Sequence, residues 1–464
     1  MRTKVIVTLG PSSANYEMVE NFLKRNIDGL RINFAHTPHN VANEWINMIR
    51  KAENATNRKV AIIGDLRGAS IRLGIMDKPL EVWPGMKLRL EIRDRARASD
   101  YVLPLPQAYE VVFKSLEPSD IISMDDGRIR LRVLETSENY ALVKAETKGT
   151  IKSHRALVVV GKDFDLPVLT SKDIKDLEFM VKKDFTYIGI SCVRKPQDID
   201  VVRKYIEELG KSSNDIRIIA KIETISAIKN LTNIIEKSDA ILVARGDLGM
   251  IFGLENIPHL QKEIVYESIK RGRTVIVATQ LLDSMINNPI PTRSEVVDIV
   301  EAVHEGADAL MLTNETAIGK YPLEAIEWLQ KIIKVAETKV YPPRIETSIT
   351  SPPIKFAKGI VDLAGAMSAK LIVFSVKGTT ARNIVRFRPR TPLIVGTNKE
   401  STLRALRIVW GVEPVIVEAK SYDEGLEKVI ELAISTGFLR KGEVAVASYG
   451  LIKERMHLIK LLMG

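Results

Sequence analysis

The segment that decides the fold contains two apolar runs, IRIIAKIE at 216–223 and AILVARGD at 240–247, with ISAIKNLTNIIEKS at 225–238 between them. Each run is short, rich in β-branched residues and apolar on both faces, which is typical of a strand buried in a parallel sheet. The segment between the runs has apolar residues spaced near 3.6, which is typical of an amphipathic helix. It therefore predicts a strand, a helix and a second strand.

Similar apolar runs occur six more times along the chain. They are VIVTLG at 5–10, GLRINF at 29–34, VAIIGD at 60–65, TYIGIS at 186–191, TVIVATQ at 274–280 and ALMLTNE at 309–315. Eight strand–helix units favour an α/β fold of the (β/α)8 TIM barrel type over the alternative, one large doubly wound sheet.

Two further domains are predicted from breaks in this pattern. Residues 73–161 form alternating strands separated by turns such as Pro84-Gly85, which predicts a small β-barrel lid domain inserted at the mouth of the TIM barrel. The barrel is assigned to 1–72 and 162–342, and the Pro-rich joint YPPRIETSITSPP at 341–353 ends it. Residues 343–464 show a second strand–helix pattern, which predicts a C-terminal doubly wound α/β domain.

Composition is that of an ordinary globular protein. Of 464 residues, 45% are hydrophobic and 27% charged, so a disordered or fibrous chain is not expected. The net charge of +10 suits nucleic acid, an anionic membrane surface or small phosphorylated ligands.

Cys192 is the single cysteine and lies in the apolar run YIGISCV, so we expect a buried packing residue and a reducing cytoplasm. No apolar run reaches the roughly 18 residues of a membrane helix, so neither export nor a membrane partner is expected.

Polar side chains follow nearly every predicted strand, at the end where a TIM barrel holds its active site. They are Arg31, Asn33, Asp65, Ser191, Lys221, Glu223, Asp247, Thr279 and Glu315. Glu223 and Asp247 end neighbouring strands, and two adjacent carboxylates suit Mg²⁺ or Mn²⁺, with water and substrate oxygens as the other ligands. Either acid alone is more often a structural ion-pair or capping residue, but a cation two residues before each favours a metal site.

The run Gly246-Asp247-Leu248-Gly249 follows a predicted strand and precedes a helical segment. Its backbone N–H groups suit an anion such as a carboxylate, and the alternative is a plain tight turn. The motifs G-x-x-x-x-G-K-[ST], G-x-G-x-x-G and H-E-x-x-H are absent. Any nucleotide is therefore expected to bind without a P-loop or a dinucleotide fingerprint.

Several stretches, in order and spacing, resemble the pyruvate kinase family over the whole chain. They are TKVIVTLGPSS at 3–13, DGLRINFAH at 28–36, DLRGASIRLG at 65–74, LPVLTSKDIKDL at 166–177, IAKIE at 219–223, LVARGDLG at 242–249, VIVATQLLDSM at 275–285, PTRSEVVDIVEAV at 291–303 and DALMLTNETAIGKYPLEAI at 308–326. The resemblance implies a glycolytic phosphotransferase that converts phosphoenolpyruvate and ADP into pyruvate and ATP. It also implies a homotetramer, with residues 343–464 as the domain for regulation and oligomerisation.

The resemblance also implies roles for the residues at the strand ends. Arg31 and Lys221 would hold the transferring phosphoryl group, and Lys221 would also stabilise the enolate that remains. Mg²⁺ or Mn²⁺ would be bound by Glu223 and Asp247. The substrate carboxylate would be held by two backbone N–H groups and a hydroxyl, those of Gly246, Asp247 and Thr279.

Two other groups of residues follow from the same resemblance. Thr313, with the neighbouring Glu315 and a bound water, would protonate the enolate. The nucleotide phosphates would meet Asn33, His36, Arg72 and Lys162. A histidine such as His36 is by itself more often a solvated loop residue, and only its place in INFAH makes it a candidate.

The chain departs from the family pattern at positions that concern potassium and the lid. Ala35 stands where potassium-dependent members have serine, and Ser70 where they have glutamate. We therefore expect that potassium is not required, although Asn33 and Asp65 stay candidate ligands for a monovalent cation. The run Gly161-Lys162-Asp163-Phe164-Asp165 also differs from the family form, so lid closure over the nucleotide is expected to be altered.

A basic segment in the C-terminal domain resembles the effector loop of some family members. The candidates in SVKGTTAR at 375–382 are Lys377, Gly378, Thr379, Thr380 and Arg382. Lys377 and the arginines at 382, 386, 388 and 390 are five cations without an acid between them, which suits a phosphorylated effector; the alternative is a solvated helix face with a subunit contact. The tail SYGLIKERMHLIKLLMG lacks a glycine-rich loop, so activation by fructose 1,6-bisphosphate is not expected.

Two alternative functions each fit part of this pattern. Another metal-dependent barrel enzyme acting on enolpyruvate or pyruvate would share the metal and the enolate but would not need the lid or the C-terminal domain. A nucleic-acid-binding protein would fit the positive charge, but aromatic residues are only 6% of the chain and no zinc-ligand set is present. We therefore expect small phosphorylated partners and no nucleic acid.

Overall fold

The computed structural model describes residues 1–464 apart from 126, 213, 340, 342–350 and 452–455. Eight parallel strands close into a barrel in the order β1-β18-β17-β16-β15-β14-β3-β2. The strands are β1 (Lys4–Thr8), β2 (Gly29–Asn33), β3 (Ala61–Asp65), β14 (Tyr187–Ile190), β15 (Arg217–Ile222), β16 (Ala240–Ala244), β17 (Thr274–Ala278) and β18 (Ala309–Leu312). They coincide with the eight predicted runs, so the TIM barrel is confirmed and the single doubly wound sheet is wrong.

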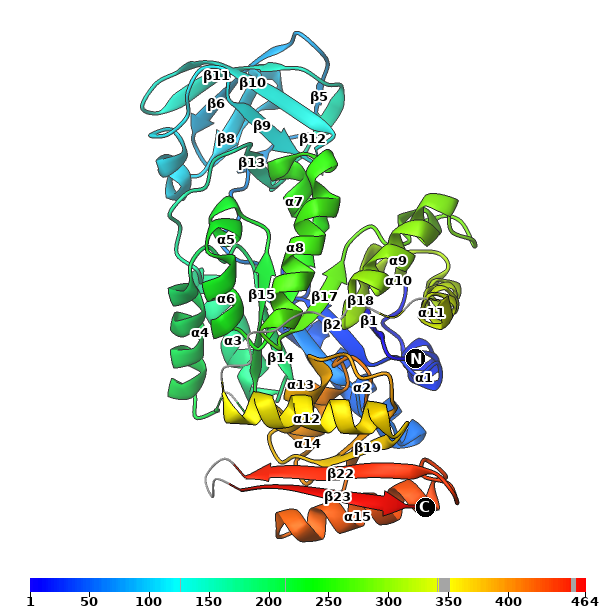
Figure 1. The fold of residues 1–464 in the computed structure, drawn as a ribbon. Coiled ribbons are helices and arrows are strands. Elements are labelled where there is room, and N and C mark those ends of the chain that lie inside the picture. Colours follow the sequence, from blue (N-terminus) through cyan, green and yellow to red (C-terminus); the bar gives the residue numbers. More distant parts are fainter. Residues whose placement is uncertain (126, 213, 340, 342–350, 452–455) are drawn as a thin grey trace.

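Helices surround the barrel and bury the outer faces of its strands (Figure 1). They are α1 (Tyr16–Lys24), α2 (His39–Thr56), α3 (Ser171–Lys182), α4 (Pro196–Glu208), α5 (Ile225–Lys229), α6 (Leu231–Lys237), α7 (Arg245–Phe252), α8 (Ile257–Lys270), α9 (Arg293–Glu305), α10 (Asn314–Ala317) and α11 (Pro322–Lys339). Side-chain caps fix several starts: the Thr170 and Thr292 hydroxyls accept from the third backbone N–H of α3 and α9. None of the described helices is long and apolar enough to cross a membrane.

The lid is inserted between β3 and α3 and lies above one end of the barrel (Figure 1). It is a curled half-barrel whose main sheet has the order β13-β9-β10-β11-β6-β8. Its strands are β4 (Ile75–Met76), β5 (Leu80–Val82), β6 (Lys87–Ile92), β7 (Arg95–Ala96), β8 (Val102–Leu105), β9 (Ile121–Met124), β10 (Ile129–Thr136), β11 (Tyr140–Ala145), β12 (Gly149–Ile151) and β13 (Leu157–Val159). The lid has its own hydrophobic core, so it is a separate packing unit.

The C-terminal domain is an α/β sheet at the opposite end of the barrel from the lid (Figure 1). Its strands have the order β21-β20-β19-β22-β23, and the last pair is antiparallel. The elements are α12 (Pro352–Ala366), β19 (Lys370–Phe374), α13 (Thr379–Val385), β20 (Leu393–Thr397), α14 (Glu400–Leu406), β21 (Val412–Ile416), α15 (Tyr422–Ser435), β22 (Val444–Leu451) and β23 (Met456–Met463). The four predicted strands are present, but β23 was not predicted. Most of the Pro-rich joint lies outside the described residues.

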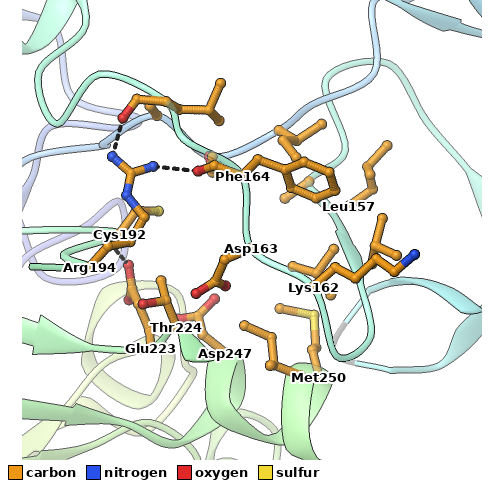
Figure 2. Close-up of a pocket in the computed structure, with 18 residues that line it drawn as sticks. Leu157, Lys162, Asp163, Phe164, Cys192, Arg194, Glu223, Thr224, Asp247 and Met250 are labelled. Carbon is orange, nitrogen blue, oxygen red and sulfur yellow. Dashed lines mark hydrogen bonds between the residues drawn. The ribbon is translucent and has the colours of Figure 1, made fainter. Parts of the chain in front are cut away.

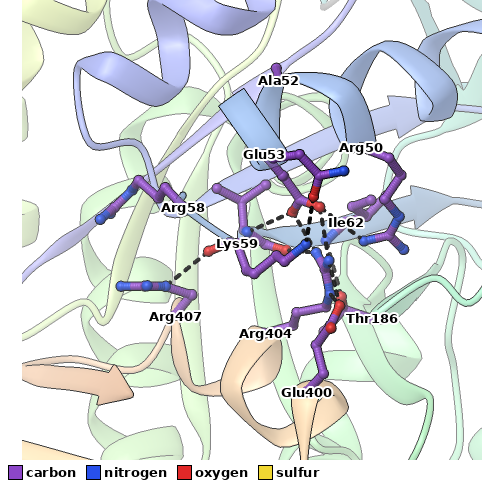
Figure 3. A network of polar contacts seen from close by, with 12 residues as sticks. Arg50, Ala52, Glu53, Arg58, Lys59, Ile62, Thr186, Glu400, Arg404 and Arg407 are labelled. Carbon is purple, nitrogen blue, oxygen red and sulfur yellow. Dashed lines mark hydrogen bonds and ion pairs between the residues drawn. The ribbon is translucent and has the colours of Figure 1, made fainter. Parts of the chain in front are cut away.

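A buried ion pair joins the C-terminal domain to the base of the barrel (Figure 3). The Arg404 guanidinium on α14 donates to both carboxylate oxygens of Glu53 on α2, at 2.5 and 2.8 Å. Tyr187 on β14 donates its hydroxyl to the carbonyl of Ala405 at 2.9 Å. Removing one partner of a buried ion pair leaves the other charge unpaired, so this interface favours one arrangement of the two domains.

Two of the five basic residues counted in the effector segment are buried in this same interface. Arg388 donates to Asp308 at 3.2 and 3.1 Å, and Arg386 donates to the carbonyl of Lys270. Only 7% of Arg386 and 5% of Arg388 are exposed. The alternative of a solvated helix face is therefore wrong for these two residues.

Candidate active site

The predicted polar residues lie at one end of the barrel, where the C-terminal ends of the strands face the lid. Arg31 and Asn33 are on β2, and Asp65 ends β3, where it is the register partner of Asn33. Lys221 is near the end of β15, and Thr279 directly follows β17. Strands that run parallel around a closed barrel bring these ends together in a single ring.

Lys221 lies at the centre of a cluster of acids and hydroxyls. Its ammonium donates to the Ser191 hydroxyl at 2.7 Å and lies 3.1 Å from Glu223 Oε2 and 4.0 Å from Asp65 Oδ2. Burial lowers the pKa of Lys221, but the charges of Asp65, Glu223 and Asp247 outweigh that effect and raise this pKa above its usual value. The ammonium therefore stays charged across the physiological pH range.

Arg31 lies beside this cluster and is oriented by Asp65. Its Nη2 and Nε donate to Asp65 Oδ2 at 2.5 and 3.0 Å, and its Nη1 donates to the Thr8 hydroxyl at 3.3 Å. Both partners are largely buried. The structure thus brings the two cations expected to hold a phosphoryl group to the same rim and links both of them to one carboxylate.

The two candidate metal ligands line one pocket between the barrel and the lid. Figure 2 shows the carboxylates of Glu223, Asp247 and Asp163 turned toward one another. Glu223 Oε1 accepts from the Cys192 N–H at 2.5 Å, whereas Oε2 is buried, lies 3.1 Å from the Lys221 ammonium and accepts no hydrogen bond. Among the described residues no cluster of three or more His, Cys, Asp or Glu side chains is arranged as a metal site. The protein would therefore supply two carboxylates and leave other coordination positions to water and substrate.

Gly246 and Thr279 form a second part of the site. Gly246 is in the first turn of α7, and its N–H donates to the Thr279 hydroxyl at 2.9 Å. Thr279 has a φ of +72° and Gln280 a φ of +52°, which β-branched and long side chains rarely adopt. Arg245 holds this turn because its guanidinium donates to both of their carbonyls, at 2.7 to 3.1 Å. Asp298 in turn pairs with Arg245 at 2.7 Å.

Thr313 and Glu315 follow β18 and contact each other. Glu315 Oε2 accepts from the Thr313 N–H at 2.7 Å and from its hydroxyl at 3.2 Å. Glu315 Oε1 accepts from the N–H of Leu282 at 3.1 Å. Glu315 is buried and ties the turn after β18 to the loop after β17, with the Thr313 hydroxyl held beside its carboxylate.

Three of the four candidate nucleotide ligands lie near one another. The pKa of His36 is lowered, first by burial and then by the nearby charges of Arg72, Arg67 and Arg31. The imidazole of His36 therefore stays neutral. Arg72 donates to the carbonyl of His154 at 3.0 Å. Asn33 accepts from the N–H of Ala35 at 3.1 Å and lies on the same turn as His36.

Lys162 is the exception among these ligands. Its ammonium donates to the Ser115 carbonyl, Glu117 and Asp120 of the lid, at 2.6 to 3.0 Å. In Figure 2 it points away from the acidic side chains of the pocket. The structure does not place the Lys162 ammonium beside the other three candidate nucleotide ligands.

Two residues that line the pocket were not predicted from the sequence to be part of the site. Asp163 was noted only as a departure from the family form, but its carboxylate accepts from the N–H groups of Ile225 and Ser226 at the start of α5, at 3.3 and 2.5 Å. Cys192 was expected to be a packing residue, but it is half-buried, lines the pocket and has a φ of +56°. Burial and the charge of Glu223 raise the pKa of its thiol, so it stays protonated.

The effector candidates lie at the opposite end of the barrel from this pocket. Gly378, with a φ of +73°, precedes α13, and Thr379 and Thr380 form its first turn. Arg382 donates to the carbonyl of Lys377 at 3.0 Å, which closes the loop on itself.

Comparisons with known proteins show which family has this architecture. The family model described as pyruvate kinase, barrel domain, matches residues 1–326, and that of the pyruvate kinase alpha/beta domain matches 355–459. The pyruvate kinase of Pyrobaculum aerophilum is 40% identical over 99% of this chain and 96% of its own, and that of Aeropyrum pernix 36% over 99% and 98%. The crystal structure of the Pyrobaculum enzyme has a TM-score of 0.90 at 38% identity, covering 99% of both chains. That of a pyruvate kinase from Cryptosporidium parvum has a TM-score of 0.91 at 29% identity, covering 100% and 96%.

The fold and these matches define a phosphotransferase built on a TIM barrel. Within that class the chain belongs to the pyruvate kinase family, as its sequence resemblance implied. Its activity is that of the family, the conversion of phosphoenolpyruvate and ADP into pyruvate and ATP.

Proposed function

We propose that phosphoryl transfer takes place beside Lys221, with Arg31 as the second cation. The observation that supports this most is the position of the Lys221 ammonium, 2.7 Å from Ser191 and 3.1 Å from Glu223 in a buried cluster. A fixed charge at this position stabilises negative charge as it moves from the phosphoryl group to the enolate oxygen. Arg31 holds the phosphoryl oxygens, and Asp65 fixes its orientation.

Glu223 and Asp247 bind the divalent cation, Mg²⁺ or Mn²⁺, in this proposal. Their fit rests on Glu223 Oε2, a buried carboxylate oxygen that is 3.1 Å from the Lys221 ammonium but accepts no hydrogen bond, in the pocket that Asp247 also lines. When bound, the cation supplies positive charge that neutralises the phosphoryl and enolate oxygens. Because Lys221 already contacts Glu223, the metal site and the phosphoryl site share one carboxylate.

Thr279, Gly246 and Asp247 hold the substrate carboxylate. The Gly246 N–H now donates to the Thr279 hydroxyl, so the carboxylate would take over that N–H and accept from the hydroxyl as well. The strained turn at Thr279 is held by Arg245, and we assign Arg245 as a positioning residue. Preorganised donors of this kind reduce the cost of ordering the site when substrate binds.

Thr313 and Glu315 deliver the proton to the enolate through a bound water. Glu315 Oε2 accepts from the Thr313 hydroxyl, which orients that hydroxyl and allows a proton to pass between them.

ADP binds under the lid with its phosphates near Asn33, His36 and Arg72. Lys162 joins them only when it leaves Glu117 and Asp120.

Potassium is not required for this reaction, in our proposal. Ala35 has no side-chain oxygen, Ser70 has no charge, and Asp65 Oδ2 is bound by Arg31. The remaining candidate ligands, Asn33 and Asp65, are too few to hold a monovalent cation by themselves.

We further propose that the protein is a cytoplasmic homotetramer. Its domains would be the barrel at 1–72 and 162–342, the lid at 73–161 and the C-terminal domain at 343–464. A phosphorylated effector would bind near Lys377–Arg382.

The metal assignment is tested by binding of Mn²⁺ to the full chain, followed by electron paramagnetic resonance. Glu223→Gln and Asp247→Asn should each weaken binding by at least about tenfold, because each removes one charged ligand. The matched control is Glu207→Gln, an exposed glutamate on α4. Unchanged Mn²⁺ binding in both variants would show that the metal lies elsewhere.

A further inference from the structure

Lys172, in the first turn of α3, contacts the turn that carries two of the candidate nucleotide ligands. Its ammonium donates to the backbone carbonyl of Phe34 at 2.6 Å. Phe34 lies between Asn33, at the end of β2, and His36, in the turn that leads to α2. No role was predicted for Lys172 from the sequence. The contact nevertheless brings a cation to the part of the barrel mouth where ADP is proposed to bind.

A buried carboxylate fixes the direction of the Lys172 side chain. Asp176, four residues later in α3, accepts from the Lys172 ammonium at 2.6 Å through Oδ2. The side chain of Asp176 is only 2% exposed, whereas that of Lys172 is 44% exposed. An ion pair between two exposed side chains contributes little, but here the acid is buried and a carbonyl of the turn shares the same ammonium. Lys172 is therefore held against the turn and is not a freely moving surface lysine.

The turn between β2 and α2 is held by α3 at both of its ends. At its start, Lys172 holds the carbonyl of Phe34, and Phe34 is itself completely buried. At its end, Asp176 Oδ1 lies 2.7 Å from Nε2 of His39, the first residue of α2. The ring of His39 also stacks on Phe179 of α3, with the ring centroids 4.6 Å apart. The candidate nucleotide ligands of this turn therefore have a fixed position relative to α3.

The first turn of α3 also holds the connection that leads from the barrel into the lid. The N–H of Gly68 donates to Asp173 Oδ1 at 3.1 Å, and Asp173 is completely buried. Gly68 has a φ of +72°, and a Cβ at this position would lie 2.8 Å from the Cβ of Ser191, so only glycine fits. Arg72 follows on the same connection. Both segments that carry candidate nucleotide ligands thus meet at the first turn of α3.

The charge of Lys172 is felt at the candidate nucleotide ligands. After burial, the cations that lower the pKa of His36 are, in decreasing order, Arg72, Arg67, Arg31 and Lys172. Lys162, the lysine that was expected here, is held instead by Glu117 and Asp120 of the lid. A group of cations at one side of a cleft attracts an anionic ligand such as a polyphosphate. Lys172 belongs to that group without any movement of the lid.

We propose that Lys172 is a positioning residue for the nucleotide. Its ammonium fixes the turn between β2 and α2 through the Phe34 carbonyl, and its charge adds to the positive field that attracts the ADP phosphates. Lys172 acts on ADP binding, so the rate of phosphoryl transfer in the complete complex depends little on it. The inference rests on the proposed binding of the ADP phosphates near Asn33, His36 and Arg72.

The test compares Lys172→Met and Lys172→Arg with Lys175→Met, which removes an exposed lysine from the same helix. Binding of ADP with Mg²⁺ to the full chain is measured by calorimetric titration, and KM and kcat by pyruvate formation. Lys172→Met should raise Kd and KM for ADP at least about fivefold, because a charge-assisted hydrogen bond to the turn is lost. In the same variant, kcat and KM for phosphoenolpyruvate should change less than about twofold.

The two other variants separate charge and position from a general loss of structure. Lys172→Arg keeps a cation that can donate to the same carbonyl, so its KM for ADP should stay within about threefold of the wild type. Lys175→Met should have the wild-type KM for ADP. An unchanged KM for ADP in Lys172→Met would overturn the inference. A loss of kcat with a rise of both KM values, not restored in Lys172→Arg, would overturn it as well.

Arg72→Met distinguishes failure of this inference from failure of the proposed nucleotide site. If Arg72→Met weakens ADP binding but Lys172→Met does not, the proposed site stands and Lys172 is not a positioning residue. If neither variant changes ADP binding, the nucleotide is bound elsewhere and both proposals are wrong.

Discussion

The backbone N–H of Gly246 donates to the hydroxyl of Thr279 at 2.9 Å and joins the ends of β16 and β17 at the mouth of the barrel. Thr279 is held there with a φ of +72°, and Arg245 donates to its carbonyl from two nitrogens. Two groups that we assign to the substrate carboxylate are thus already in contact. The contact suggests that this part of the site is formed before substrate arrives.

Removal of the Thr279 hydroxyl tests this assignment. Thr279→Val keeps the branched shape and the strained turn but removes the donor to the carboxylate. A hydrogen bond to a charged group is worth about 1.5–3 kcal/mol, so kcat/KM for phosphoenolpyruvate should fall roughly 10- to 100-fold. Thr279→Ser keeps the hydroxyl and serves as the control, with a value near the wild type. Equal kinetics for the two variants would exclude a role for the hydroxyl.

Potassium dependence gives a second prediction. Replacing tetramethylammonium chloride with potassium chloride at fixed ionic strength should change the initial rate less than about twofold, because Ala35 and Ser70 supply neither the hydroxyl nor the charge that a monovalent cation needs. The double variant Ala35→Ser/Ser70→Glu should gain a response to potassium. A several-fold activation of the wild type would contradict this account.

Glu305 gives a prediction about stability and pH. Burial raises the pKa of Glu305 to about 7, although Gln261 donates to its carboxylate at 2.8 Å. The folded protein therefore holds a proton that the unfolded chain, with a pKa near 4.5, has released. Stability should fall as the pH rises from about 4.5 to 7 and then level off.

Urea unfolding of the wild type and of Glu305→Gln between pH 4 and pH 8 measures this effect. The variant cannot ionise, so its free energy of unfolding should exceed that of the wild type at pH 8 by more than it does at pH 4. Parallel pH profiles for the two proteins would rule out a raised pKa at this position.

The fold was largely predictable because each barrel strand is buried on both faces and either ends in a polar residue or is directly followed by one. The run IRIIAKIE is an example, since its apolar side chains serve both the barrel interior and the helix layer. Strand β23 was not predictable in the same way. It is an edge strand whose outward side chains, such as Ile459 and Leu461, are apolar, so the alternation that indicates a half-exposed strand is missing.

The sequence predicts where the candidate site residues lie but not which residues their side chains contact. The end of a strand fixes where Lys221 or Thr279 lies, because parallel strands share one rim. It does not fix which partner a long side chain selects, and Lys162 is held by lid acids that are distant in sequence from it. Arg386 and Arg388 were counted as loop cations for the same reason, because a charge pattern does not show which domain will cover it.

The lid contacts of Lys162 lead to a prediction about ADP. If Lys162 binds the nucleotide phosphates as proposed, the lid acids Glu117 and Asp120 compete with those phosphates for its ammonium. Asp120→Asn should then lower KM for ADP, and Lys162→Met should raise it several-fold. KM for phosphoenolpyruvate should change much less in both. If Lys162→Met leaves KM for ADP unchanged, Lys162 is a structural residue of the lid and not a nucleotide ligand.

The charged cluster around Lys221 is tested most directly by a coupled assay of pyruvate formation from phosphoenolpyruvate and ADP with Mg²⁺. Lys221→Met and Glu223→Gln should each lower kcat by at least about 100-fold, because each removes preorganised charge from the transferring group. Lys334→Met, an exposed lysine on α11, should keep the wild-type rate. Wild-type rates in both Lys221→Met and Glu223→Gln would contradict the assignment of the active site, even with pyruvate kinase activity present.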